Sequence, residues 1–317
     1  MQQDLEQNTV SGSSEGFDTT PAYGQQETLV SGAGPVNEQT KLPSIGTHLK
    51  EAYAMVVDRA GVLSVAYIAL FIVNILTLYI AAKVVFLLAF NSGGFEMILP
   101  LMALVGIGCV AYGVWTVIIV MIVDSLLTPH ENSTVGRHIY RAVALFVPAL
   151  WIVILVGLAT TGGFVLLVIP GILLSLWFSL VIPVMIADRY RGWDALCASR
   201  ELVRNYTGEV FIRYLVVGIL LAVIGGIAGL ILDLVVSAVL PSYGLMELIV
   251  SQIIPILINT VLWIYIVAFG VRLYQYLKER KGVVDPSNPK RGWYMAAAVL
   301  GLLVILGYTA MIGSVLL

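Results

Sequence analysis

The sequence predicts an all-α protein: a transmembrane helical bundle of about seven spans, with six spans in one domain and one added at the C-terminal end. Composition is the first observation, because 59% of the 317 residues are hydrophobic and 11% are charged, whereas soluble domains carry about 25% charged residues. The apolar residues also form runs of about 18 residues or more, which suffice to cross the hydrocarbon of a membrane. The basic residues, finally, lie almost entirely between alternate runs.

Seven apolar runs account for most of the chain, at about residues 62–90, 97–127, 142–160, 164–187, 211–239, 245–271 and 293–316. Each run is predicted to be a helix, because every backbone amide in hydrocarbon needs a partner within its own segment. The turn between the third and fourth runs has two candidate positions, Thr160 to Gly163 or Pro170 with Gly171. Proline interrupts the helical hydrogen bonds and glycine tolerates a turn, so both positions stay open.

The basic residues predict the orientation of the chain. All Lys and Arg residues except Lys83 precede the first run or belong to the second, fourth and sixth loops. They are Lys41, Lys50, Arg59, Arg137, Arg141, Arg189, Arg191, Arg200, Arg204, Arg213, Arg272, Lys278, Arg280, Lys281, Lys290 and Arg291. Loops next to the cytoplasm carry the excess of Lys and Arg. We therefore expect a multi-pass membrane protein with its N-terminus in the cytoplasm and its C-terminus outside.

Four regions follow from this reading. Residues 1–48 are predicted to form a disordered acidic and polar cytoplasmic tail, since the segment is rich in Ser, Gly, Gln, Thr and Glu and cannot bury a core. It also lacks the basic and apolar parts of a secretory signal. Residues 49–277 form the six-helix membrane domain, 278–292 a basic cytoplasmic loop, and 293–317 the additional transmembrane helix.

A short motif occurs twice. Residues 120–124 read VMIVD and residues 184–188 read VMIAD, which indicates either a duplicated hairpin or a chance match between membrane segments. Asp124 and Asp188 would each end a helix, where a negative charge is unfavourable. We expect them to join a structural ion-pair network with Arg137, Arg189 and Arg191; the alternative is a proton or cation site.

The residues after Asp188 predict an amphipathic helix at the cytoplasmic interface. On a 3.6-residue period one arc holds Ala195, Leu196, Ser199, Leu202, Val203 and Tyr206, and the other holds Asp194, Arg200, Glu201, Arg204 and Asn205. Arginines at such an interface can meet anionic lipid headgroups. The candidate residues for binding lipids or partner proteins are therefore Arg189, Arg191, Arg200, Arg204, Arg137 and Arg141. The alternative is that these segments only anchor the topology.

A family resemblance rests on part of this region. The order Ile169, Pro170, Gly171, an apolar run to Pro183 and Asp188, and then Ala195, Leu196, Ser199 and Leu202 resembles a bacterial superfamily. That superfamily includes the membrane domain attached to some glycerophosphodiester phosphodiesterases and related uncharacterised inner-membrane proteins. The resemblance covers about Val62 to Leu277 and is most specific from Ile169 to Asn205, where Asn205 replaces the usual glycine. It implies a six-helix domain without an established activity of its own, in a multi-pass protein of the bacterial cytoplasmic (inner) membrane.

Polar groups inside the spans are candidates for function, because they are costly in a membrane. Lys83 and Asp233 fall at the same outer level and could pair there. Asn74, Gln252 and Asn259 could line a cavity or bond between helices. Gly225 and Gly229, four residues apart, predict a close helix contact.

Catalytic and metal-binding patterns are not found in the sequence. The spacing of His48, His130 and His138 does not suit a zinc helix, so we expect no metal, no cofactor and no enzymatic activity. Nucleic-acid binding is not expected, because the basic loops are short and lie against the membrane. The leading hypothesis is a protein that binds lipids, or other membrane proteins, at the cytoplasmic interface. The alternative is a transporter of a small solute or lipid, for which we expect a midplane cavity lined by Asn74, Gln252 and Asn259.

Overall fold

The computed structural model describes residues 42–90, 98–128, 134–239, 245–282 and 291–316, and every structural statement below concerns these residues. They form helices α1 (Ile45–Asp58), α2 (Ala60–Phe90), α3 (Ile98–Leu127), α4 (Val135–Ala144), α5 (Phe146–Leu166), α6 (Val168–Phe178), α7 (Val181–Ala187), α8 (Trp193–Val203), α9 (Thr207–Val239), α10 (Leu245–Lys281) and α11 (Arg291–Leu316), with a 3₁₀ turn at Arg204–Tyr206 before α9. No strand occurs in these ranges. The predicted tail up to residue 41 and loop residues 283–290 lie outside the described residues.

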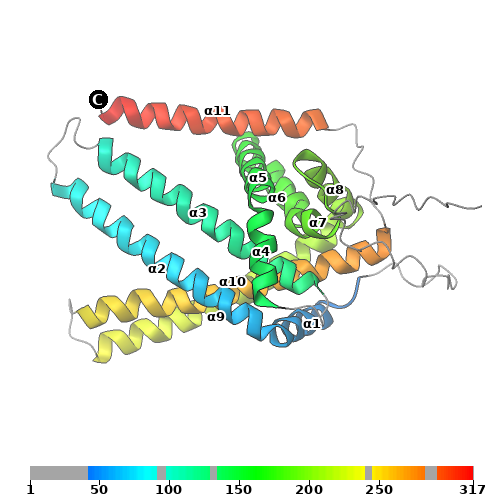
Figure 1. Cartoon of the computed structure of the whole chain (residues 1–317), viewed down its shortest axis with the longest axis horizontal. Helices are drawn as coiled ribbons and strands as arrows, with labels where there is room; N and C mark the ends of the chain where they lie inside the picture. The colour runs from blue at the N-terminus through cyan, green and yellow to red at the C-terminus, as the bar shows by residue number, and fades with distance from the viewer. Residues whose placement is uncertain (1–41, 91–97, 129–133, 240–244, 283–290, 317) are drawn as a thin grey trace, which may run out of the picture. The chain divides into compact units, whose positions relative to one another are not determined.

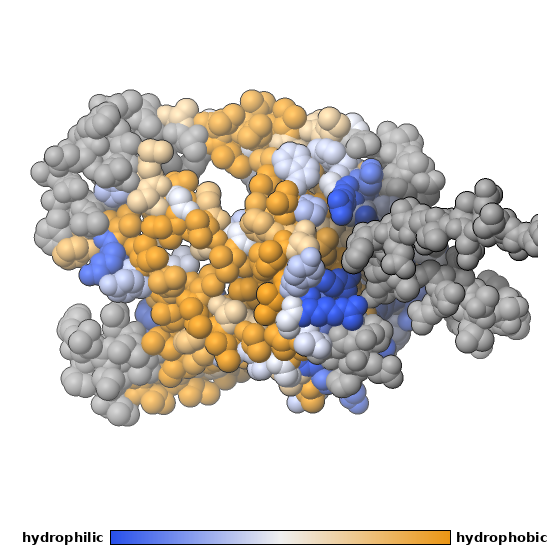
Figure 2. Space-filling view, in the orientation of Figure 1, coloured by the Kyte–Doolittle hydropathy of each residue, from blue (hydrophilic) through white to orange (hydrophobic). Residues whose placement is uncertain are grey.

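The transmembrane bundle predicted from the sequence is confirmed. Six stretches are long and apolar enough to cross a membrane, and α11 adds a shorter apolar stretch, Tyr294–Gly307. Figure 1 shows α2 with α3, and α9 with α10, as two long hairpins, and α11 ends on the same side as α2 and α9. Figure 2 shows the long helices covered by hydrophobic residues, while hydrophilic residues gather mainly at the opposite end, where α1 and the C-terminal end of α10 lie.

The turn between the third and fourth spans lies between its two candidate positions. α5 ends at Leu166 and α6 begins at Val168, with Leu167 in an extended conformation (φ −167°, ψ 154°). Pro170 therefore sits in the first turn of α6, where backbone N–H groups have no helical partner to lose. Both predicted turn positions are thus wrong. A Cβ at Gly163 would lie 3.2 Å from the amide nitrogen of Gly171, so these glycines let the two arms meet.

Helix α11 packs closely along α5 through a pair of glycines. A Cβ at Gly301 would overlap the carbonyl oxygen of Leu158, and a Cβ at Gly162 would overlap that of Ala297. Small residues allow such close approach, on which helix association in lipid depends. Of the glycines predicted to pack, a Cβ at Gly225 would lie 3.3 Å from Leu262 Cδ1, whereas nothing lies within 4 Å of a Cβ at Gly229.

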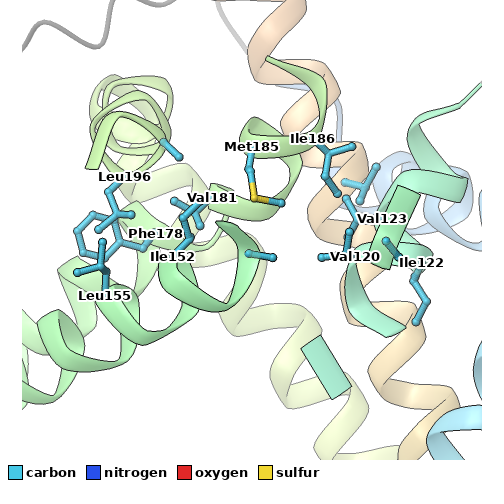
Figure 3. Close-up of a cluster of buried hydrophobic side chains, with 14 of the residues drawn as sticks. Val120, Ile122, Val123, Ile152, Leu155, Phe178, Val181, Met185, Ile186 and Leu196 are labelled. Atoms are coloured by element: carbon cyan, nitrogen blue, oxygen red, sulfur yellow. The ribbon is translucent and has the colours of Figure 1, made fainter. Parts of the chain in front are cut away.

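The two copies of the repeated motif pack against each other in the core. Figure 3 shows Val120 and Val123 at the end of α3 facing Ile186 and Met185 of α7, and all four side chains are buried. Because the four belong to one hydrophobic cluster, they fix the end of α3 against α7. Whether the motif reflects a duplication stays a prediction.

Helix α1 begins at Ile45, inside the range predicted as tail, and is held on α10. Its His48 is buried, stacks on the Phe269 ring with centroids 4.1 Å apart and contacts the Phe269 carbonyl oxygen at 3.2 Å. Glu51 accepts a hydrogen bond from Arg272 at 2.8 Å and another from Tyr276. Burial lowers the pKa of His48 from 6.5 to about 4.

Replacing Gly301 by Ala is expected to destabilise the bundle, because the new methyl group must push α5 and α11 apart. Overpacking of this kind costs about 1–3 kcal/mol. Thermal unfolding in detergent measures the effect. Gly307→Ala is the matched control, since nothing lies within 4 Å of its Cβ position and alanine favours the helix. Equal unfolding midpoints for Gly301→Ala and the unmodified protein would contradict the close contact.

Docking of α1 is expected to weaken as the pH falls from about 6.5 to about 4. In this window unfolded His48 binds a proton that the folded state excludes, so stability is present above pH 6.5 and declines below it. Hydrogen exchange of residues 45–58 measures docking. His48→Phe keeps the stacked ring without a titrating group and should flatten this part of the pH dependence. An unchanged pH dependence in that variant would rule out His48 as its source.

Candidate functional site: two cavities along α10

A cavity of about 260 Å³ lies between α2, α3 and α10. Asn74 of α2 and Gln252 and Asn259 of α10 line it, so the structure brings together the three amide residues that the sequence singled out. We call it the amide cavity. Asn74 lies 14 residues past the start of α2, roughly 21 Å along the helix at about 1.5 Å per residue, which is well inside a span.

The polar side chains of the amide cavity are held by their own helices. The amide nitrogen of Asn74 donates to the Leu70 carbonyl at 2.8 Å, and that of Asn259 donates to the Pro255 carbonyl at 3.0 Å. The hydroxyl of Thr260 donates to the Ile256 carbonyl at 2.7 Å. Each of these bonds reaches back one helical turn, so the side chains are oriented without a partner from another helix.

A second cavity, of about 290 Å³, adjoins the first on the side of α9. Its walls are mostly apolar, with hydroxyl groups from Thr116, Ser179 and Tyr214; we call it the tyrosine cavity. Gly270 leaves room for the Tyr214 hydroxyl, which would lie 3.1 Å from a Cβ at that position. Val123 and Pro183 also line it, so the packed ends of α3 and α7 form part of its wall.

Two tryptophans belong to both cavities. Trp115 of α3 and Trp263 of α10 line each one and meet edge to face, with ring centroids 4.8 Å apart and planes at 72°. Gln252 in the amide cavity and Val271 in the tyrosine cavity are 19 residues apart on α10. That separation is roughly 29 Å, close to the hydrocarbon thickness of about 30 Å. The cavities therefore follow one another along most of a span.

The predicted pair between Lys83 and Asp233 is not formed. Lys83 instead lies over the Tyr79 ring, 5.8 Å from its centroid, and the described residues contain no ion pair between Lys83 and Asp233. Neither residue lines either cavity. Equal depth on two helices could not show that the side chains meet, because depth says nothing about the direction in which each points.

The basic residues predicted at the cytoplasmic interface fall into three groups. Arg137, Arg189, Arg191 and Arg204 are exposed. Arg141 is half-buried and pairs with Asp124 at 2.8 Å. Arg200 was predicted to meet lipids or partner proteins, and this prediction is wrong because only 6% of the residue is exposed. Its guanidinium lies 4.8 Å from the Trp177 ring centroid and 5.5 Å from that of Tyr294.

The burial of Arg200 follows from the packing of α8. This helix lies against α6 and α7, and all residues from Ala195 to Arg200 are buried. On the predicted polar arc, Asp194, Arg204 and Asn205 are exposed and Glu201 is half-buried. The two arcs are therefore largely as predicted, and Arg200 is the residue that departs from them.

Both motif aspartates are in ion pairs, as predicted, although their recorded partners differ from the expected ones. Buried Asp124 contacts His138 at 2.6 Å and Arg141 at 2.8 Å, both on α4. Asp188 accepts a hydrogen bond from Tyr274 at 2.9 Å and pairs with Lys278, both on α10. The two pairs tie α3 to α4 and the end of α7 to α10.

Sequence reasoning missed Trp115, Trp263 and Tyr214 as cavity residues. Tryptophan is enriched at membrane–water interfaces, whereas Trp115 lies 12 residues before the end of α3. A tryptophan this far inside a span is unusual, and its position could have marked it as a candidate cavity residue. The described residues contain no group of three or more His, Cys, Asp or Glu that could hold a metal ion.

Comparison with protein-family models, with curated proteins and with solved structures finds no match to this chain. The resemblance to the membrane domain of glycerophosphodiester phosphodiesterases stays a prediction. The all-helical fold and the six apolar stretches of the described residues are those of a multi-pass membrane protein.

Proposed function

We propose that this protein is a transporter, without catalytic activity, that carries a small molecule through the amide and tyrosine cavities. The observation that carries the proposal is the polar lining of the amide cavity by Asn74 and Asn259, which lie inside the spans, and by Gln252 at the end of one span. Polar side chains at that depth are costly and mark pathways. We place the protein in the bacterial inner membrane, with its N-terminus in the cytoplasm and its C-terminus outside.

The order of the cavities supports passage in addition to binding. The tyrosine cavity reaches Gly270 and Val271, next to Arg272, whereas the amide cavity extends to Gln252. A molecule that moved from one to the other would pass the Trp115–Trp263 pair, which lines both. Side-chain rotation at this contact would open or close the route without displacing a helix, and such rotations are fast.

Aqueous access to position 259 tests the route. In a variant with Cys109 and Cys197 replaced by Ala, Asn259→Cys is reconstituted in liposomes and treated with a small, charged, membrane-impermeant thiol reagent. We expect it to react at least about tenfold faster than Ile219→Cys, an exposed position of α9 that lines neither cavity, because thiolates form and react in water and not in hydrocarbon. Equal, slow reaction at both positions would contradict an aqueous route.

A second candidate function, binding of anionic lipids at the cytoplasmic interface, is supported by α4. Its Ile139, Tyr140 and Val143 are exposed beside exposed Arg137. This combination of apolar and basic side chains suits a helix that lies among lipid headgroups. Exposed Arg191 and Arg204 would add to the same attraction, worth about 1 kcal/mol per residue near an anionic surface.

Neutralising Arg137 and Arg191 together by glutamine is expected to reduce the preference for anionic lipids about thirtyfold, since two charges of about 1 kcal/mol each are removed. The ratio of phosphatidylglycerol to phosphatidylcholine that co-purifies from mixed bilayers measures this preference. Arg200→Gln is the comparison, because its buried guanidinium cannot meet headgroups. An unchanged ratio in the double variant would exclude these arginines from lipid selection.

A further inference from the structure

The amide groups of Asn74 and Asn259 can be oriented from their contacts. A backbone carbonyl only accepts hydrogen bonds, so the group facing it must be the amide nitrogen. Asn74 faces the Leu70 carbonyl and Asn259 faces the Pro255 carbonyl. The carbonyl oxygen of each side chain is thus left for another partner in the cavity that both residues line.

Thr260 adds an acceptor to the same wall. It uses its hydroxyl hydrogen on the Ile256 carbonyl, which leaves its oxygen as an acceptor. Donors line the cavity as well, because each asparagine amide keeps a second N–H and Gln252 contributes its amide group. A matching molecule therefore carries groups that both donate and accept hydrogen bonds, as hydroxyl groups do.

Charge narrows the class of molecule further. Among the described residues that line the two cavities there is no Asp, Glu, Lys, Arg or His. Taking an ion out of water without a counter-charge costs several kcal/mol. A charged molecule would meet this cost at both cavities, whereas an uncharged one would not.

The volume and the lining of the amide cavity limit the size and shape of its occupant. The amide cavity, at about 260 Å³, is slightly below the usual range for ligand pockets, about 300–1,000 Å³, so its occupant is small. The indole rings of Trp115 and Trp263 line the same cavity and offer apolar surface. A molecule that fits has hydroxyl groups on one side and carbon–hydrogen groups on the other.

We propose that the transported molecule is a small uncharged polyol or sugar. Its hydroxyl groups would donate to the oxygen atoms of Asn74, Asn259 and Thr260, and its carbon face would lie on the tryptophans. This inference rests on the proposed transport function and adds the class of substrate to it.

Flux into proteoliposomes tests the class. Entry of radiolabelled mannitol, of the anion gluconate and of the cation glucosamine is measured against protein-free liposomes. We expect mannitol to enter at least about tenfold faster with protein, and the two ions to enter no faster than without it. Asn74→Leu with Asn259→Leu should abolish the mannitol signal. Thr77→Val is the matched control on α2, because Thr77 also bonds back to its own helix, to Val73, but does not line the amide cavity; its flux should be unchanged.

A charge exchange makes the result specific to Asn259. In Asn259→Asp the carboxylate supplies the missing counter-charge, so glucosamine entry should rise and mannitol entry should fall. Flux of an ion but not of mannitol in the unmodified protein would overturn the substrate class and leave transport intact. An unreactive thiol in the Asn259→Cys variant, together with no flux of any of the three compounds, would overturn the transport function itself. Mannitol flux that survives the double leucine variant would overturn the assigned oxygen acceptors.

Discussion

The hydrocarbon solvent is the constraint on which the rest of this structure depends, because it offers no hydrogen-bond partner to a polar group. The long helices satisfy their own backbones and expose apolar side chains. The same constraint acts on Asn74, Asn259 and Thr260, each of which bonds to a carbonyl one turn back. These internal bonds make polar side chains tolerable at mid-depth, and they also decide which atoms remain for a ligand.

Packing between helices then fixes where these polar groups lie. The Gly162–Gly301 contact brings α11 against α5, and the two motif copies hold the end of α3 against α7. Ion pairs of Asp124 and Asp188 lock α4 and α10 to the same end of the bundle. With that end fixed, α2, α3 and α10 line the amide cavity farther along their length, where the sequence supplies amides and tryptophans among the aliphatic side chains.

Much of this could be predicted from the sequence, because membrane spans are encoded by long apolar runs and by the placement of basic residues. The amide cavity was anticipated at Asn74, Gln252 and Asn259, since polar residues in apolar runs stand out individually. Contacts between elements could not be predicted. The burial of Arg200 depends on Trp177 and Tyr294, which come from distant segments, and the absence of a Lys83–Asp233 pair among the described residues depends on helix rotation. The turn at Leu167 lies between the two predicted positions because Gly163 and Gly171, which suggested a turn, instead allow α5 and α6 to pack closely.

The central claim is that the amide cavity is a binding site for a small uncharged molecule. A cryo-electron microscopy map of the protein in lipid nanodiscs with saturating mannitol tests it most directly. The account predicts compact density within hydrogen-bonding distance of the side-chain oxygens of Asn74 and Asn259 and in contact with Trp115 or Trp263. Continuous acyl-chain density in that cavity, or α2 and α10 packed together without a cavity, would contradict it.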